Sequence, residues 1–149
     1  MLVVFDIDGT LANIEHRLDY VRSKPKNWAA FDAGIPNDQV NPHVAAAFFA
    51  LRDAGHDIVF ASGRNERTRD DTVAWLDANG FWSPDSHLWM RKGHDFRSDD
   101  VVKQEILDQI IEQFGRKPDM VFDDRPRVVR MWRDNGIFVF NVYQGEEDF

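Results

Sequence analysis

The chain has 149 residues, and its 26 acidic and 18 basic side chains give a formal net charge of −8 at neutral pH. This charge argues against non-specific coating of nucleic acid, which depends on neutralising many phosphates, but it leaves binding to one nucleic-acid end open. The absence of cysteine excludes disulfides, thiolate metal sites and cysteine nucleophiles.

The sequence contains no candidate membrane span, since no window approaches the roughly 20 apolar residues that a span needs. The short apolar stretch at the N-terminus ends at Asp6 and has no basic segment before it, which favours a strand over an export signal. We therefore expect a cytoplasmic protein that does not enter a membrane.

Five short apolar runs predict the buried strands of one sheet. They are, in chain order, Leu2–Phe5, Ile58–Ala61, His87–Met90, Met120–Phe122 and Ile137–Val142. Amphipathic stretches between them predict helices from 42 to before 55, from about 66 to 79, from about 99 to 114 and from 126 to before 136. This alternation is typical of an α/β fold with a mostly parallel five-stranded sheet and helices on both faces. One domain over residues 1–149 accounts for it.

The first predicted strand runs directly into Asp6-Ile7-Asp8-Gly9-Thr10. Because side chains alternate along a strand, Asp6 and Asp8 are expected to point to the same side. Two carboxylates this close favour a bound cation or a shared proton, and Thr10 adds a hydroxyl and a main-chain N–H. The alternative is an ordinary Asp-Gly turn. Asp6 at the end of an apolar strand favours the functional interpretation.

Residues 13–40 fit the alternation of strands and helices poorly. They contain Arg17, Trp28, Phe31 and a turn-rich stretch at 34–38. Connections of this length are often functional, so the segment is expected to be a small cap or flap over the site, or merely a long connection. Most tryptophans of the chain are expected in the core or in an interface, and Trp28 is the exception because of its place in this segment.

Three residues after the second predicted strand, Ser62-Gly63-Arg64, suit a phosphate. The Ser62 hydroxyl and nearby N–H groups can cradle a phosphate oxygen, and the Arg64 guanidinium supplies a charged fork. The tripeptide alone is weak evidence, but the carboxyl end of a strand is where an α/β sheet binds its ligands.

Two later pairs of charged residues complete the candidate site. Asp99 and Lys103 are four apart at a helix start, so they form either a surface ion pair or a functional pair in which Asp99 orients Lys103 toward phosphate and nucleophile. Asp123 and Asp124 end an apolar strand, where burying unpaired charge is costly. A metal ligand with a partner behind it explains both, and the alternation of the strand leaves open which of them contacts the ion.

These residue types supply the parts of a phosphoryl transfer, which needs a nucleophile, a proton carrier and positive charge. Asp6 can attack phosphorus to give an aspartyl-phosphate, and Asp8 can protonate the leaving oxygen and later activate water. Mg²⁺ suits an all-oxygen site drawn from Asp6, Asp8, Asp123 and Asp124. The residues expected to bind the substrate phosphate are Thr10, Ser62, Gly63, Arg64 and Lys103.

In order and rough spacing, the motifs resemble those of the haloacid dehalogenase superfamily of aspartate-nucleophile phosphatases. Residues 6–10 look like its first motif, Ser62 its second, Lys103 its third and Asp123-Asp124 its fourth. The resemblance covers nearly the whole chain and implies a Rossmann-like fold with at most a small cap.

The chain is also similar to the 3′-phosphatase domains of T-even phage polynucleotide kinase/phosphatases, over residues 5–12, 62–64, 99–103, 123–125 and more broadly from 97 to the end. This resemblance favours Asp124 over Asp123 as the direct metal ligand. It implies that catalysis is served by Asp6, Asp8, Arg17, Arg64, Asp99, Lys103 and Asp124. No Gly-x-x-x-x-Gly-Lys-Ser/Thr motif is present, so kinase activity is not implied.

The sequence therefore predicts a Mg²⁺-dependent phosphomonoesterase that removes 3′-phosphates from DNA or RNA ends, without an obligate protein partner. A 5′(3′)-nucleotidase acting on nucleoside monophosphates is the alternative enzyme, because the Asp-Asp-Arg-Pro sequence at 123–126 resembles those enzymes. A catalytically silent phosphate-binding module is the alternative of another class. Binding alone does not require Asp8, which argues against it.

Overall fold

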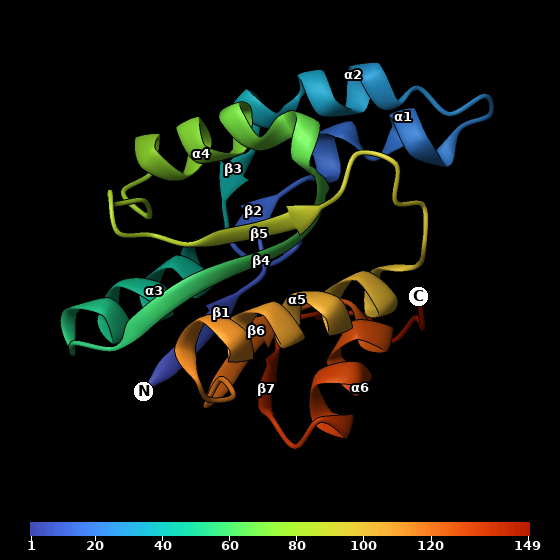
Figure 1. Ribbon diagram of the computed structural model, residues 1–149. Coiled ribbons are helices and arrows are strands. Elements are labelled where there is room, and N and C mark those ends of the chain that lie inside the picture. Colours follow the sequence, from blue (N-terminus) through green and yellow to red (C-terminus); the bar gives the residue numbers. More distant parts are fainter.

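A five-stranded sheet forms the centre of the computed structural model, which describes all 149 residues. Every neighbouring pair of strands is parallel, and the spatial order is β5-β4-β1-β6-β7 (Figure 1). The strands are β1 (Leu2–Phe5), β4 (Asp57–Asn65), β5 (Leu88–Arg91), β6 (Met120–Asp123) and β7 (Phe138–Asn141). All five predicted strands are present, so the predicted α/β fold is confirmed.

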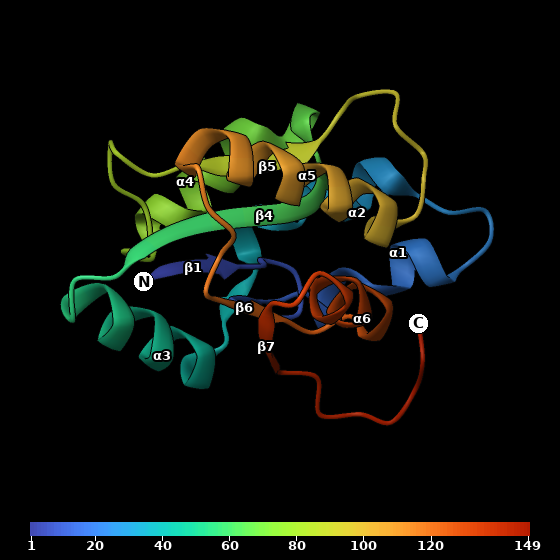
Figure 2. The ribbon, with the colours of Figure 1, turned by 60° about the horizontal axis from the view of Figure 1, so that its bottom comes forward.

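Four longer helices cover the two faces of the sheet (Figure 2). They are α3 (Pro42–Asp53) and α4 (Arg69–Ala78) on one face, and α5 (Asp99–Phe114) and α6 (Pro126–Asp134) on the other. The side chains of β1 alternate between the faces: Val3 and Phe5 pack with α3 and α4, whereas Leu2 and Val4 pack with α5 and α6. None of the helices has the length and apolar character that crossing a bilayer requires.

β4 is longer than predicted and contains Ser62, Gly63 and Arg64, which we expected to follow the strand. Its pairing with β5 is regular at Ala61 and resumes at Asn65 after a shift in register. Irregular pairing of this kind often re-aims side chains next to a site. A short 3-10 turn, η3 (Glu66–Thr68), then leads into α4, so the predicted helix begins three residues later than expected.

The order of the strands reverses at β1, because the chain adds β4 on one side of it and β6 on the other. In open α/β sheets, ligands bind at the carboxyl ends of the strands where this reversal occurs. The main-chain N–H of Asp6, just after β1, donates to the carbonyl of Phe122 in β6 at 3.0 Å. The fold thus brings the first and the last acidic motif of the chain to the same crevice.

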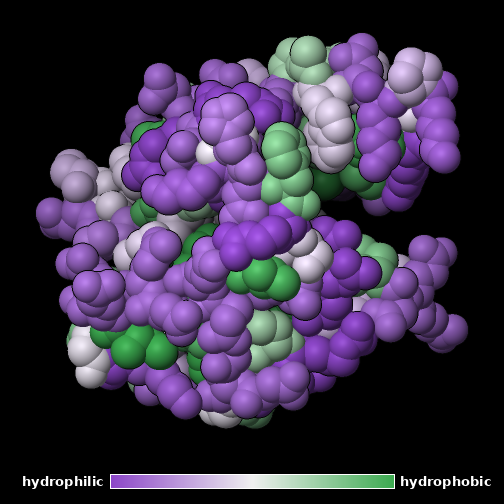
Figure 3. Space-filling model, turned by 45° about the vertical axis from the view of Figure 1, so that its right-hand side comes forward, coloured by the Kyte–Doolittle hydropathy of each residue, from purple (hydrophilic) through white to green (hydrophobic).

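Residues 12–40 form short elements beyond the carboxyl ends of the strands (Figure 1). These are β2 (Ala12–Asn13), η1 (Glu15–Arg17), α1 (Asp19–Arg22), α2 (Trp28–Ala33), η2 (Ile35–Asn37) and β3 (Gln39–Val40). β2 and β3 pair with each other, and buried Ile35 anchors the segment to the core. α1 and α2 contain no buried residue. Figure 3 shows an open notch in the surface below this part of the molecule.

Candidate active site

Three carboxylates form an acidic cluster where β1 and β6 end. Asp6, Asp123 and Asp124 each place an oxygen within 4.8 Å of the others. The strands are neighbours in the sheet, which is why residues so far apart in the sequence converge. The structure therefore brings together the first and fourth motifs named above.

Lys103, from the second turn of α5, is the positive charge of this cluster. Its ammonium group donates to Asp6 Oδ1 at 2.6 Å and to Asp123 Oδ2 at 2.8 Å, and the residue is 3% exposed. Burial lowers the pKa of Lys103, but the charges of Asp123 and Asp6 outweigh it and hold the pKa well above its ordinary value. Lys103 is thus a permanent cation that fixes one oxygen of Asp6.

Asp123 and Asp124 differ in how many donors they already have. Asp123 Oδ2 accepts from Lys103 and from the indole N–H of Trp132 at 3.1 Å. Its Oδ1 accepts from the main-chain N–H groups of Asp124 and Arg125 at 2.9 and 3.3 Å. Asp124 has only the Thr10 hydroxyl within reach, at 3.3 Å, and shares its single proton with Asp6 Oδ2 at 3.0 Å. The geometry therefore favours Asp124 as an oxygen ligand and gives Asp123 the role of positioning Lys103.

The acidic cluster carries more negative than positive charge. Burial, followed by the charge of Asp123, raises the pKa of Asp124 to about 6 and that of Asp6 well above its ordinary value. Gly9 makes room for this arrangement: it has φ +78°, and a Cβ there would lie 2.1 Å from Asp124 Oδ2. An oxygen-only donor set with surplus negative charge fits Mg²⁺.

Thr10 differs from expectation, because it turns toward the carboxylates. Its hydroxyl lies 3.0 Å from Asp6 Oδ2, and its main-chain N–H donates to the carbonyl of Ile7 at 3.1 Å. We expected Thr10 to bind the substrate phosphate. Thr10 instead fixes the second oxygen of Asp6, opposite the one that Lys103 holds.

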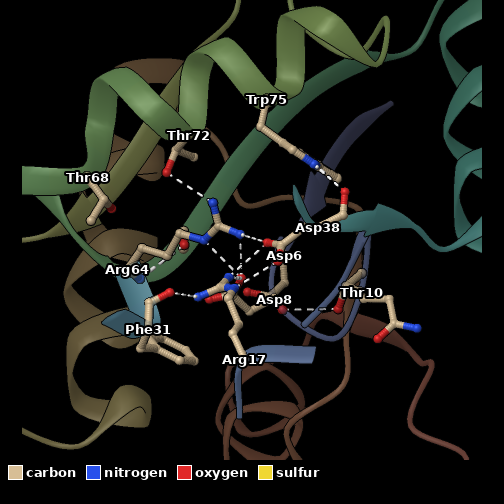
Figure 4. A network of polar contacts seen from close by, with 12 residues as sticks. Asp6, Asp8, Thr10, Arg17, Phe31, Asp38, Arg64, Thr68, Thr72 and Trp75 are labelled. Atoms are coloured by element: carbon tan, nitrogen blue, oxygen red, sulfur yellow. Dashed lines mark hydrogen bonds and ion pairs between the residues drawn. The ribbon is translucent and has the colours of Figure 1, made fainter. Parts of the chain in front are cut away.

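Two buried arginines and two aspartates form a second group, the arginine cluster (Figure 4). Its members are Arg17, Arg64, Asp8 and Asp38. Asp8 Oδ1 accepts from Arg64 Nε and Nη2 at 2.9 and 2.6 Å and from Arg17 Nη2 at 3.1 Å. Asp38 accepts two bonds from Arg17, at 2.8 and 2.9 Å, and one from Arg64 at 3.1 Å. The second motif and Arg17 thus meet the first motif at Asp8.

Asp8, which we expected among the metal ligands, does not place its carboxylate with those of Asp6, Asp123 and Asp124. The carboxylate faces the two guanidinium groups and is not part of the acidic cluster. Burial raises the pKa of Asp8, but Arg64 and then Arg17 outweigh it, so the pKa lies below its ordinary value. Asp8 is ionised in the free protein because the arginines hold it so.

Asp38 is a member of the site that the sequence analysis missed. Its side chain is fully buried, accepts from His16 Nε2 at 2.7 Å in addition to the arginines, and its carbonyl accepts from Trp75 Nε1 at 2.9 Å. The pairing of β2 with β3 folds Asp38 back toward Asp8. No spacing in the sequence predicts the contact of Asp38 with the two arginines, and an aspartate in a turn-rich stretch is ordinarily solvated.

Asp99 lies at the site but does not orient Lys103, contrary to expectation. Its carboxylate pairs with Arg91 and Arg125 instead. A Cβ on Gly63 would lie 2.9 Å from Asp99 Oδ1, so only glycine lets the carboxylate lie this close to β4. Arg91 also donates to the carbonyl of Gly63 at 3.0 Å, and the buried hydroxyl of Ser62 accepts from the N–H of Arg64 at 3.1 Å. These contacts support the irregular end of β4 that carries Arg64.

Comparisons with known proteins agree with this geometry. Residues 1–149 match the family model described as the polynucleotide kinase PNKP phosphatase domain. A protein of Autographa californica nuclear polyhedrosis virus, named as a bifunctional polynucleotide kinase/RNA ligase, is 33% identical over 99% of this chain. A chain of the Pnkp1/Rnl/Hen1 RNA repair complex is 28% identical over 98% of this chain, with a TM-score of 0.78.

Both relatives are much longer than this chain, which spans 20% of the viral protein and 43% of the repair-complex chain. A haloacid dehalogenase-like hydrolase from Streptococcus pneumoniae shares the fold, with a TM-score of 0.67 at 15% identity over 99% of this chain and 86% of its own. The match of the family model over the full chain decides the family. The chain belongs to the polynucleotide kinase PNKP phosphatase domains and is a hydrolase, a phosphatase with the haloacid dehalogenase fold.

Proposed function

We propose that the chain removes the 3′-phosphate from a DNA or RNA end through an aspartyl-phosphate on Asp6. The observation that carries this proposal is the setting of the Asp6 carboxylate, 5% exposed, with Lys103 on one oxygen and Thr10 on the other. A carboxylate fixed at both oxygens is oriented before substrate arrives, which removes part of the entropic barrier to attack. Family membership supports the reaction class, and the relatives' names support a nucleic-acid end.

In the first step, a carboxylate oxygen of Asp6 forms a bond to phosphorus while the bond from phosphorus to the 3′-oxygen breaks. The leaving oxygen takes a proton from Asp8. In the second step, Asp8 takes a proton from water, the hydroxide oxygen bonds to phosphorus, and Asp6 is released together with inorganic phosphate. Mg²⁺ held by Asp6 and Asp124 would supply the positive charge that lets an anionic nucleophile approach an anionic substrate.

Asp8 needs a raised pKa to donate a proton, and the arginine cluster provides a route to it. In the free protein, Arg17 and Arg64 bind Asp8, which keeps the carboxylate ionised. Phosphate oxygens are strong acceptors that compete for guanidinium forks. When the arginines turn to the phosphate, Asp8 loses its partners, its pKa rises, and it takes up from solvent the proton that it then gives to the leaving oxygen.

The surroundings of the site favour a polymer end over a mononucleotide. The notch under α1 and α2 is open to solvent (Figure 3), and this leaves room for a strand to continue away from its terminal phosphate. A nucleotidase would be expected to enclose its small substrate more completely. We therefore rank the nucleotidase second.

The test compares phosphate release from a 3′-phosphorylated oligonucleotide, a 3′-nucleoside monophosphate and a 5′-nucleoside monophosphate, with Mg²⁺ present. We expect the highest kcat/KM for the oligonucleotide. A higher kcat/KM for the 5′-nucleotide would replace the proposal by the nucleotidase. Tight phosphate binding without release from any of the three would replace it by the silent binding module.

A further inference from the structure

An exposed tryptophan lies on the rim of the site, at the start of α2. Trp28 is 50% exposed, although a large aromatic ring is ordinarily buried when nothing outside the protein covers it. Its position is fixed: the Asn27 side chain caps α2 by accepting from the N–H of Ala30 at 3.0 Å, and the N–H of Asn27 donates to the carbonyl of Tyr20 at 2.7 Å. The ring is therefore presented to solvent by an ordered turn.

Trp28 is linked to the arginine cluster through one other ring. Its indole packs edge-on against Phe31, with ring centroids 5.7 Å apart. The guanidinium of Arg17 lies 4.3 Å from the centroid of the Phe31 ring. Only the Phe31 side chain thus separates the exposed ring from Arg17, which we propose as a phosphate ligand. A separation of one side chain is comparable to the size of one nucleoside.

The segment around Trp28 is positively charged in an otherwise acidic chain. Residues 20–31 contain Arg22, Lys24 and Lys26 and no acidic residue, whereas the whole chain has a net charge of −8. All three basic side chains are exposed. The ammonium group of Lys26 lies 5.7 Å from the Trp28 ring centroid. An exposed ring beside exposed cations suits a ligand that has both flat apolar faces and negative charge.

We propose that residues 20–31 bind the end of the nucleic-acid strand, with the terminal base stacked on Trp28 and the next backbone phosphates near Lys24 and Lys26. Stacking on an aromatic ring tolerates every base, because each has a π-face. The segment would therefore bind strand ends without regard to sequence. The inference rests on the proposed function, since the 3′-phosphate in the arginine cluster sets the distance to the first base.

The experiment compares Trp28→Ala and Trp28→Phe with the wild type on three substrates. These are a 3′-phosphorylated oligonucleotide, the same oligonucleotide with an abasic 3′-terminal nucleotide, and p-nitrophenyl phosphate. We expect Trp28→Ala to raise KM for the first substrate on the order of tenfold. The KM values for the abasic oligonucleotide and for p-nitrophenyl phosphate should change less than twofold. Trp28→Phe should bring the KM for the normal oligonucleotide most of the way back to the wild-type value. Phe138→Ala, at an even more exposed ring on β7, is the control and should leave KM unchanged for all three substrates.

Equal losses on all three substrates would mean that Trp28 only supports Phe31 and Arg17, and an unchanged KM for the normal oligonucleotide would mean that it binds no base. Either result overturns the inference. Binding of a fluorescent 3′-phosphorylated oligonucleotide to Asp6→Asn protein, with and without Trp28→Ala, separates this failure from that of the proposed function. Loss of this binding on Trp28→Ala, together with a wild-type protein that releases no 3′-phosphate from the same oligonucleotide, would support the strand site while rejecting the 3′-phosphatase reaction.

Discussion

The acidic cluster and the arginine cluster begin two residues apart, at Asp6 and Asp8, yet they differ in charge balance. Three carboxylates face one ammonium group in the acidic cluster, whereas two carboxylates face two guanidinium groups in the arginine cluster. Burial raises the pKa of Asp124 and of Asp8 alike. Only at Asp8 do neighbouring cations outweigh it, so the pKa of Asp124 is about 6 while that of Asp8 is lowered.

Because of this difference in charge, the two clusters bind ligands in different ways. The acidic cluster has surplus negative charge, so a cation completes it. The arginine cluster is complete in the free protein, so a phosphate must displace Asp8 from the arginines in order to bind. The same substitution, aspartate to asparagine, should therefore change stability in opposite directions in the two clusters.

The largest effect is expected from Asp6→Asn, which removes the nucleophile. An amide cannot form the phosphoryl ester, so kcat should fall by at least about 10⁴-fold. The fold should persist, because the substitution also removes one of the three crowded carboxylates. Single-turnover phosphate release and circular dichroism check both points. Asp77→Asn, at an exposed position of α4, is the control, and retained turnover in Asp6→Asn would refute the covalent route.

Asp38→Asn tests the arginine cluster, in which positive and negative charges are balanced. It leaves Arg17 and Arg64 with Asp8 alone, and uncompensated buried charge typically costs about 3 kcal/mol of unfolding free energy. We expect kcat/KM to fall about 100-fold, because the arginines lose the geometry that serves the phosphate. Urea unfolding and phosphate release measure the two effects.

Asp32→Asn is the matched control for Asp38→Asn, since Asp32 forms a more exposed pair with Arg67 at 2.9 Å in the same segment. Exposed pairs contribute at most about 1 kcal/mol. If Asp38→Asn cost no more stability than Asp32→Asn, the arginine cluster would not be the self-contained network that its contacts indicate.

The same comparison explains how much of the site the sequence could predict. Asp6, Asp123 and Asp124 each lie at the end of an apolar strand, and the rule that ligands bind at the carboxyl edge of a parallel sheet was enough to group them. The five strands and four longer helices followed from periodicity and from the turn residues between them. Their bounds differ from expectation mainly at β4, where the register shift after Ala61 keeps Ser62 to Arg64 within the strand.

The arginine cluster could not be predicted in the same way. Asp38 meets Arg17 and Arg64 only because β2 and β3 pair, and two-residue strands leave too little pattern to recognise. The assignment of Asp99 to Lys103 failed for a related reason. Helical spacing identifies neighbours along α5, but Arg91 and Arg125 come from β5 and from the loop after β6, and compete successfully for Asp99.

Asp124→Asn tests the acidic cluster, which has surplus negative charge. The effect of this substitution on stability depends on pH. The ordinary pKa of 3.8 is raised to about 6 in the folded protein. Between these values the folded state binds more protons than the unfolded state, so this group lowers stability as pH rises from about 4 to 6, and the penalty persists above that range. Without metal, Asp124→Asn should thus be more stable than the wild type at pH 7.5, by at most about 3 kcal/mol, and about equal to it near pH 4.

Mg²⁺ should remove this penalty in the wild type. Its addition at pH 7.5 is expected to raise the Tm of the wild type and to have little effect on Asp124→Asn, which lacks the charge to hold the ion. Thermal unfolding with Mg²⁺, and separately with EDTA, provides the measurement. An equal rise of Tm in both proteins would remove Asp124 from the metal site.

The smallest effect is expected from Trp132→Phe, which tests the one carboxylate of the acidic cluster that is already satisfied. The indole N–H of Trp132 shares Asp123 Oδ2 with Lys103, and the residue is fully buried. Phenylalanine keeps an aromatic ring there but removes the donor, at a cost of about 1 kcal/mol in unfolding free energy. Asp123 then holds Lys103 less firmly, so kcat should fall a few-fold while KM stays the same.

Trp82→Phe makes the same change at a partly buried ring that stacks on Phe60 and is remote from the acidic cluster. The difference in unfolding free energy between the two variants isolates the bond to Asp123. If both variants lost the same stability and neither changed kcat, Asp123 would hold Lys103 without help from Trp132. The larger number of hydrogen-bond donors to Asp123 would then not explain why Asp123 and Asp124 have different roles.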